Sequence, residues 1–175
     1  MIIWLNGAFG SGKSTTASKL QKLLPESHIY DPEEAGFFIR NNAPRSMLTG
    51  DFQDIPLWRE INYKMLKAMN ESNEGVVIVP MTLINPEYYN DIIGKLIAAG
   101  IDVRHFILSL DKYTITKRLR KRAWGVMRKE KFALDSIDRC IHSYDNYITE
   151  TKIAAHGKSA YDIALEIIDL CKLQV

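Results

Sequence analysis

The stretch Gly7-Ala8-Phe9-Gly10-Ser11-Gly12-Lys13-Ser14 decides the fold of this chain. It matches the pattern G-x-x-x-x-G-K-[ST] at every fixed position, and it stands between an apolar run at 2–5 and a helix-forming segment at 15–20. In that setting the pattern predicts a loop whose backbone N–H groups surround phosphate oxygens. A coincidental glycine-rich turn is the alternative, but the strand before the loop and the helix after it both favour a phosphate loop.

The residue types of this loop suit contact with ATP. We expect Lys13 to reach the β- and γ-phosphates and the Ser14 hydroxyl to ligate Mg²⁺. Phe9 is unusual among small residues, and it either packs over the ligand or packs against the neighbouring helix. The expected nucleotide-binding residues of the loop are Gly7, Phe9, Gly10, Ser11, Gly12, Lys13, Ser14 and Thr15.

Strand-length apolar runs alternate with helical patterns, as expected of a parallel sheet covered by helices on both faces. We predict a single α/β domain over residues 1–175, a three-layer P-loop kinase fold with a five-stranded parallel sheet and a helical lid at about 118–137. The strand order 2-3-1-4-5 comes from analogy with that fold and not from periodicity. The expected strands are 1–5, 27–30, 75–79, 103–110 and 151–154.

Helix starts are marked by capping signals. Asp31-Pro32-Glu33-Glu34, Asn85-Pro86-Glu87 and Ser159-Ala160-Tyr161-Asp162 each combine a capping side chain with an early proline or acidic residue. Asp111 is interpreted as a further N-cap. A helix from about 56 to 69 is expected to place Leu57, Ile61, Met65 and Ala68 on one face against the core.

Composition excludes some classes of protein. Hydrophobic residues make up 46% of the chain, charged residues 25%, and the net charge is +2, which is ordinary for a soluble globular domain. Cys140 and Cys171 lack C-x-x-C spacing, which argues against a disulfide framework or zinc site and suits a cytoplasmic protein. We expect the apolar face of 161–171 to pack on its own sheet, without membrane association.

Ligands of open α/β sheets bind beyond the carboxyl ends of the strands, so functional side chains are expected directly after each strand. Asp31 follows the second strand and either accepts a proton from a substrate hydroxyl, holds Mg²⁺ through water, or only caps a helix. Arg40 either binds an anionic or polyhydroxy substrate or is a solvated surface arginine without such a role. No carboxylate follows the third strand, so Mg²⁺ would be held by Ser14, phosphate oxygens and water. Thr82 or Asp31 would then contact a water ligand of the metal and not the metal itself.

Positive charge is densest at Lys117-Arg118-Leu119-Arg120-Lys121-Arg122. Arg118 and Arg122 share a helix face, and we expect both to contact the nucleotide and the transferring phosphoryl group when a lid containing 124–135 closes. A nucleic-acid-binding helix is the alternative, but the patch is short and lacks interleaved aromatic residues, so no nucleic acid is expected. His156, in the turn after the fifth strand, is expected near the nucleotide base.

Two strings are more distinctive than the phosphate loop. They are Asp51-Phe52-Gln53-Asp54-Ile55-Pro56-Leu57-Trp58-Arg59 and Ile78-Val79-Pro80-Met81-Thr82, joined by Tyr30-Asp31-Pro32-Glu33, His105-Phe106 and Ile137-Asp138-Arg139-Cys140. With these strings the sequence resembles the tunicamycin resistance protein family over most of its length. The resemblance implies a P-loop kinase fold related to nucleoside monophosphate kinases, ATP binding and protection against tunicamycin.

The first string has a physical interpretation of its own. Phe52, Gln53, Trp58 and Arg59 offer stacking and polar groups that suit a nucleobase-and-sugar ligand, although Trp58 is equally suited to the core. Three functions stay open: phosphoryl transfer to a drug such as tunicamycin, sequestration of the drug without transfer, and a kinase for an ordinary nucleotide or sugar. A monomer or a homodimer is expected. The expected substrate-binding residues are Asp31, Arg40, Phe52, Gln53, Trp58 and Thr82.

Overall fold

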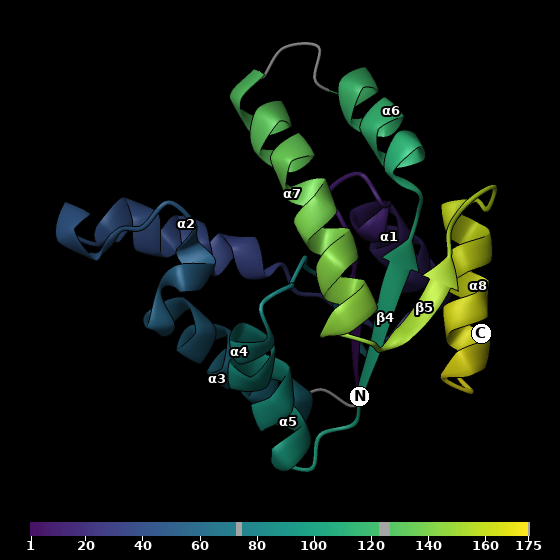
Figure 1. The fold of residues 1–175 in the computed structure, drawn as a ribbon. Coiled ribbons are helices and arrows are strands. Elements are labelled where there is room, and N and C mark those ends of the chain that lie inside the picture. The colour runs from purple at the N-terminus through teal and green to yellow at the C-terminus, as the bar shows by residue number, and fades with distance from the viewer. Residues whose placement is uncertain (73–74, 123–126, 175) are drawn as a thin grey trace.

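The computed structural model describes residues 1–72, 75–122 and 127–174 of the chain. Its centre is a parallel sheet of five strands in the order β2-β3-β1-β4-β5, with helices on both faces (Figure 1). This confirms the predicted P-loop kinase fold and its strand order. The strands are β1 (Ile2–Asn6), β2 (His28–Ile29), β3 (Val77–Pro80), β4 (Val103–Ser109) and β5 (Thr151–Ala154).

The helices follow the strands in alternation, so each crossover carries the chain to the next parallel strand. They are α1 (Lys13–Leu23), α2 (Pro32–Asn42), α3 (Pro56–Ser72), α4 (Pro86–Tyr89), α5 (Lys95–Ala98), α6 (Lys112–Arg122), α7 (Met127–Asn146) and α8 (Ala160–Leu170). Two 3-10 turns, η1 (Arg45–Met47) and η2 (Phe52–Asp54), occupy the link between α2 and α3, and a π-helical segment, η3 (Asn90–Gly94), joins α4 to α5.

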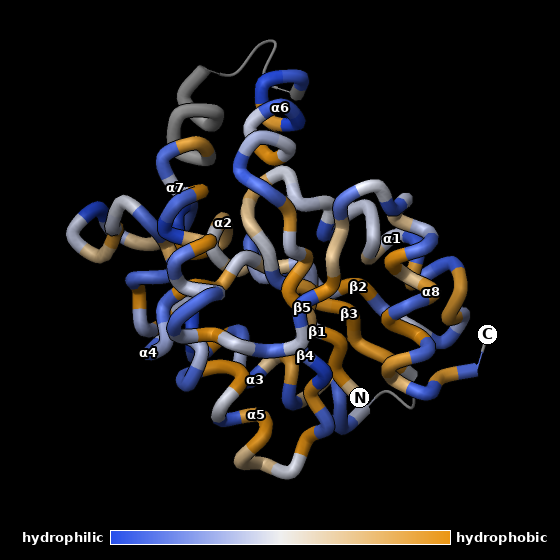
Figure 2. Tube along the Cα trace, turned by 45° about the vertical axis from the view of Figure 1, so that its right-hand side comes forward, coloured by the Kyte–Doolittle hydropathy of each residue, from blue (hydrophilic) through white to orange (hydrophobic). Residues whose placement is uncertain are grey.

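Alternate residues of β1 belong to different apolar clusters. Ile3 and Leu5 face the cluster that contains α1 and α8, whereas Ile2 and Trp4 face the cluster that contains α3 and α5. All five residues of β1 are buried because the strand lies in the middle of the sheet between β3 and β4. Figure 2 shows the result as a hydrophobic centre at the strands with hydrophilic helix surfaces around it.

The helix face predicted for α3 is wrong. Leu57 and Met65 are 41% and 47% exposed, and the face turned to the core instead carries Trp58, Asn62 and Leu66. Hydrophobicity alone selected the wrong side because two buried positions, Arg59 and Asn62, are polar and find hydrogen-bond partners. The Asn62 amide donates to the Trp58 carbonyl at 2.7 Å, and its oxygen accepts the Tyr30 hydroxyl at 2.8 Å.

The predicted helix starts are confirmed by their caps. Backbone N–H groups donate to the carboxylate of Asp31 at 3.0 Å, to the amide oxygen of Asn85 at 2.8 Å and to the carboxylate of Asp111 at 2.8 Å. Ser159 and Asp162 form a reciprocal capping box at the start of α8. The apolar face of α8 packs beside α1, and Cys140 and Cys171 are buried free thiols.

Three helices extend from the end of the sheet where the strands stop. In Figure 1, α2 projects to one side, and α6 and α7 rise together, with their far ends well away from the sheet. These two helices occupy most of the predicted lid, whereas Trp124 and Gly125 lie outside the described residues. In the part of the chain that the structure describes, none of the helices combines the length and apolarity required to cross a bilayer.

His105 makes the stability of the fold depend on pH. Its ring is buried against Tyr89, with centroids 5.6 Å apart, and neither ring nitrogen has a hydrogen-bond partner among the described residues. Burial lowers the pKa of His105 from 6.5 to about 3. As the pH falls through about 6.5, His105 takes up a proton in the unfolded chain but stays neutral in the folded chain. The free energy of unfolding is therefore largest above that pH and decreases below it.

We predict that the free energy of unfolding falls by up to about 1.4 kcal/mol per pH unit between pH 7 and 5 through this residue. His105→Phe keeps a ring against Tyr89 and is expected to flatten the decline measured by urea unfolding. His28→Gln, at an exposed position, is the control and should retain it. Equal declines in the two variants would show that His105 is not the responsible group.

Candidate functional site

Three glycines shape the loop between β1 and α1. Gly7, Gly10 and Gly12 have φ of 143°, 83° and 107°, a region that favours glycine. At Gly7 a Cβ would also lie 2.6 Å from the Ser11 hydroxyl oxygen. Gly12 precedes α1 without a side-chain cap, so the first N–H groups of the helix face the loop with their partial positive charge.

Lys13 lies inside this loop. Its ammonium is buried and donates to the carbonyls of Gly7 at 2.8 Å and Ala8 at 3.2 Å, 5.7 Å from the centre of the Phe9 ring. The Thr82 hydroxyl, at the end of β3, donates to the same Gly7 carbonyl at 2.9 Å. Thr82, expected from the sequence to contact substrate, is thus placed so that it braces the phosphate loop.

Asn6 joins the loop to two other parts of the chain. Its side-chain oxygen accepts the N–H groups of Gly7 and Leu83, both at 2.9 Å, and the hydroxyl of Tyr144 at 2.7 Å. Its amide donates to the Leu83 carbonyl at 2.7 Å. Neither Asn6 nor Tyr144 was predicted as a site residue, although a polar residue at the end of an apolar strand is a usable signal. The buried amide of Asn6 therefore forms hydrogen bonds with the start of the loop, with the segment after β3 and with helix α7.

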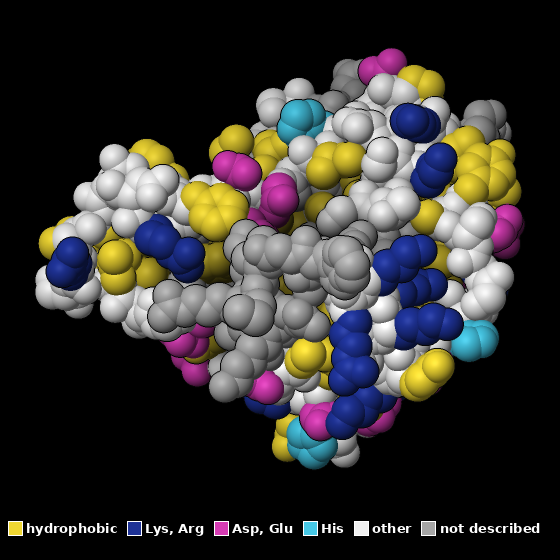
Figure 3. All heavy atoms as spheres, turned by 90° about the horizontal axis from the view of Figure 1, so that it is seen from above, with side chains coloured by type: hydrophobic (Ala, Val, Ile, Leu, Met, Phe, Trp, Pro, Cys, Tyr) yellow, Lys and Arg dark blue, Asp and Glu magenta, His cyan; other side chains and the backbone are white. Residues whose placement is uncertain are grey.

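A pocket of about 470 Å³ opens beside the loop. Arg118 and Lys121 from α6 and Lys158 from the β5–α8 turn line it, and Figure 3 shows Lys and Arg side chains gathered on the α6 side of this face. The Arg118 guanidinium lies 3.3 Å from the Ser11 carbonyl. The Ser11 hydroxyl is buried and has no hydrogen-bond partner among the described residues. A cationic pocket continuous with a phosphate loop fits a nucleotide.

His156, expected near the nucleotide base, is not among the residues that line this pocket. His156 is exposed, and its ring nitrogen lies 3.2 Å from the Asp111 carboxylate, while Lys158, two residues later, is the one that lines the pocket. The hydrogen bonds of Asp111 to Thr114 lower its pKa from 3.8 to about 2, with a smaller contribution from His156. The side chain of Arg122 lies outside the described part of the structure.

The residues expected to hold the substrate lie around η2. Gln53 donates to the Thr82 carbonyl at 3.0 Å, which places η2 beside the phosphate loop. The Phe52 ring lies 5.9 Å from the Arg40 guanidinium carbon. Trp58 is fully buried and donates to the Pro32 carbonyl at 2.9 Å, so of its two interpretations the structure places it in the core. Asp31 is exposed and caps α2.

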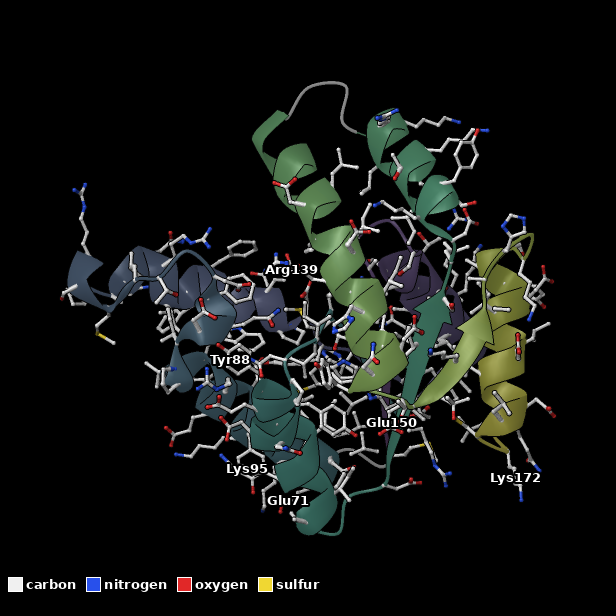
Figure 4. The ribbon with its side chains drawn as sticks, viewed as in Figure 1. Glu71, Tyr88, Lys95, Arg139, Glu150 and Lys172 are labelled. Atoms are coloured by element: carbon white, nitrogen blue, oxygen red, sulfur yellow. The ribbon has the colours of Figure 1, made fainter. Side chains whose placement is uncertain are left out.

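Arg59 fixes η2 to the neighbouring helices. It is 7% exposed, donates to the Gln53 carbonyl at 2.6 Å and to the Asp91 carboxylate at 2.9 Å, and stacks 4.3 Å from the centre of the Tyr88 ring. The Tyr88 hydroxyl in turn donates to Asp54 at 2.7 Å. Figure 4 labels Tyr88 beside α4. Lys95 and Arg59 hold the pKa of Asp91 below its usual value, so the ion pair persists at neutral pH.

The residues of this site are compatible with Mg²⁺ that takes most of its ligands from nucleotide phosphates and water. Among the described residues no group of three or more His, Cys, Asp or Glu side chains could hold a metal ion, and no carboxylate occurs between 75 and 84. Ser14, exposed in the first turn of α1, supplies a hydroxyl. Mg²⁺ keeps several waters and binds phosphate oxygens readily, so one protein hydroxyl is compatible with it.

The phosphate loop, the cationic pocket and the strand order together define a nucleotide-binding protein of the P-loop kinase fold. The model of the AAA domain family AAA_33 matches residues 2–145, and the chain belongs to this family. No curated protein sequence matches the chain.

Solved structures share this fold. The Deinococcus radiodurans tunicamycin resistance protein is 26% identical, with a TM-score of 0.82 over 99% of this chain and 96% of that one, which confirms the resemblance inferred from the sequence. The Mycobacterium tuberculosis APS kinase CysC in complex with AMPPNP and APS is 18% identical, with a TM-score of 0.63 over 98% and 96% of the two chains. The M. mycoides deoxyadenosine kinase is 16% identical, with a TM-score of 0.60 over 98% and 99%.

We predict that Asn6→Ala destabilises the protein by at least about 3 kcal/mol, because it leaves three buried donors and one buried acceptor unpaired. Urea unfolding would measure the loss. Asn42→Ala is the control, since that exposed amide makes only one described hydrogen bond, to the Phe38 carbonyl. If the two variants lose equal stability, Asn6 does not have the structural role assigned to it.

Proposed function

We propose that the protein is an ATP-dependent phosphotransferase that moves the γ-phosphoryl group of ATP to a hydroxyl of a small molecule, with tunicamycin as the candidate acceptor. The observation that carries the proposal is that Gln53 hydrogen-bonds to the Thr82 carbonyl while the Thr82 hydroxyl hydrogen-bonds to Gly7. The η2 segment and the phosphate loop are thereby adjacent, as donor and acceptor sites of a kinase must be.

ATP would occupy the loop and the cationic pocket. The α1 N-terminus and Lys13 would contact the β- and γ-phosphates, and Arg118, with Lys121 and Lys158, would hold the remainder of the nucleotide. Mg²⁺ bound between phosphate oxygens and Ser14 would neutralise charge on the transferring group. Arg118 moves with α6, so closure of α6 and α7 over the site would bring its charge nearer to the phosphates. Arg122 remains a proposed contact on the same helix.

Asp31 is proposed as the base that accepts the acceptor's hydroxyl proton. It stands at the carboxyl end of β2, beside β3, and is exposed although it caps α2. Only one carboxylate oxygen is used by the cap, because the Glu33 N–H donates to Oδ1. Arg40, on the same helix, and Phe52 and Gln53 on η2 are proposed to hold the acceptor.

Drug sequestration is the second candidate. The absence of a carboxylate between 75 and 84 favours it, because P-loop enzymes usually hold the metal with an acid after this strand. In that case ATP would shape the pocket without being consumed. A kinase for an ordinary nucleotide or sugar remains a third candidate, supported by fold alone.

Lys13→Ala is expected to weaken binding of an ATP analogue by at least about 100-fold, because it removes the buried charge of the phosphate loop. Isothermal titration with AMPPNP measures the change. Lys22→Ala, at an exposed position near the end of α1, is the matched control and should bind as the unchanged protein does. Unchanged binding by Lys13→Ala would contradict the proposed nucleotide site.

Mass spectrometry separates transfer from sequestration. Protein incubated with ATP, Mg²⁺ and tunicamycin is expected to yield tunicamycin carrying one phosphate group. Asp31→Asn should reduce the rate by at least about 100-fold while leaving AMPPNP binding unchanged, because a general base acts on the acceptor and not on the nucleotide. Tight drug binding without product would favour sequestration, and product from a nucleoside or sugar alone would favour the third candidate.

A further inference from the structure

The side chains that line the nucleotide pocket are rich in hydrogen-bond donors. The charged ones, Arg118, Lys121 and Lys158, are all cations, which donate hydrogen bonds and accept none. Among the described residues that line the pocket there is no Asp, Glu, Asn, Gln or His, and the other polar side chains are hydroxyls. A ligand in this pocket therefore meets charged donors without a carboxylate or amide side chain to accept from it.

Lys158 adjoins the apolar part of this pocket. Arg118 lies against the phosphate loop, 3.3 Å from the Ser11 carbonyl, whereas Lys158 directly precedes the part of the wall that Ala160 and Ile163 form. Figure 1 shows the turn between β5 and α8, which carries Lys158, at the same end of the sheet as the start of α6. An apolar wall suits the face of a base. A nucleotide with its phosphates in the loop and its base on this wall would present the edge of the base to Lys158.

Glu166 holds the ammonium of Lys158 in place. The Lys158 Nζ donates to the Glu166 Oε2 at 2.5 Å, and the capping box of Ser159 and Asp162 fixes the start of α8 between the two residues. Both side chains of the ion pair are 37% exposed, so the pair is half-buried at the pocket. An ammonium has three donors, and this group makes no second hydrogen bond within the described part of the chain. Two N–H donors of a positioned ammonium are therefore available to a ligand.

We propose that Lys158 makes the nucleotide site selective for a 6-oxopurine base, as in guanine, over adenine, so that GTP binds more tightly than ATP. This inference rests on the proposed function and deepens it by naming the base of the phosphoryl donor, because the phosphate contacts are common to both nucleotides. Adenine and guanine share the N7 acceptor but differ at carbon 6, where guanine carries an oxygen and adenine an amino group. An ammonium donates to O6 and N7 of guanine, whereas at the amino group of adenine a donor meets a donor.

Binding of nucleoside diphosphates tests the proposal, because ADP, GDP and IDP differ only in the base and carry no γ-phosphoryl group to transfer. In isothermal titrations with Mg²⁺ present, GDP and IDP are expected to bind at least about tenfold more tightly than ADP. IDP has the 6-oxygen without the 2-amino group of guanine, so it identifies the oxygen as the group that is recognised. Lys158→Met keeps the apolar stem without the donors and should reduce the preference to less than about threefold, whereas Lys158→Arg keeps donors and should retain it.

Lys152→Met is the matched control. Lys152 also forms an ion pair, with Asp145 at 2.6 Å, and its side chain is similarly exposed at 40%, but it does not line this pocket. The variant loses the same charge, and its preference among the three diphosphates should equal that of the unchanged protein.

Four results would overturn the proposal and leave the phosphotransferase function intact. They are binding of ADP as tight as that of GDP or tighter, a preference for GDP that IDP does not share, a preference that survives Lys158→Met, and an equal loss of preference in Lys152→Met. Failure of all three diphosphates to bind would overturn the proposed function as well, because it would contradict the nucleotide site itself.

Discussion

The hydrogen bonds around the Asn6 side chain are the constraint on which the rest of the structure depends. Through Gly7 they fix the first residue of the phosphate loop, through Leu83 they fix the chain after β3, and through Tyr144 they fix α7. The amide is fully buried, so each bond forms in a medium where an unpaired partner is costly. The start of the phosphate loop is thereby fixed to the sheet and to α7 by hydrogen bonds within the protein.

The two sides of the site are built from different kinds of interaction. On the nucleotide side, backbone groups and cations dominate, because the common feature of nucleotides is their phosphate charge. Around η2, the Arg59–Asp91 ion pair and the aromatic rings of Phe52 and Tyr88 support a short segment whose own side chains face several elements.

Much of this architecture could be predicted from the sequence, because it is determined by interactions between residues close together in the chain. The phosphate loop, the strand alternation and the capping residues each depend on neighbours a few positions apart. The face of α3 was not readable, because Asn62 is buried through partners on other elements. The hydrogen bond between Asn6 and Tyr144 joins residues 138 positions apart, and no periodic pattern in the sequence indicates such a contact. For the candidate site, residue types were identifiable, but which of them face a ligand depended on packing, as Trp58 and Thr82 illustrate.

The hydrogen bonds of Lys13 have a consequence for how nucleotide affinity is set. Its buried ammonium is solvated by the protein's own carbonyls at Gly7 and Ala8, so the charge is never left without oxygen partners. A bound phosphate oxygen would compete with these carbonyls for the same N–H donors. Affinity for such a ligand would then reflect the difference between two sets of hydrogen bonds, and not the full strength of the charge contact.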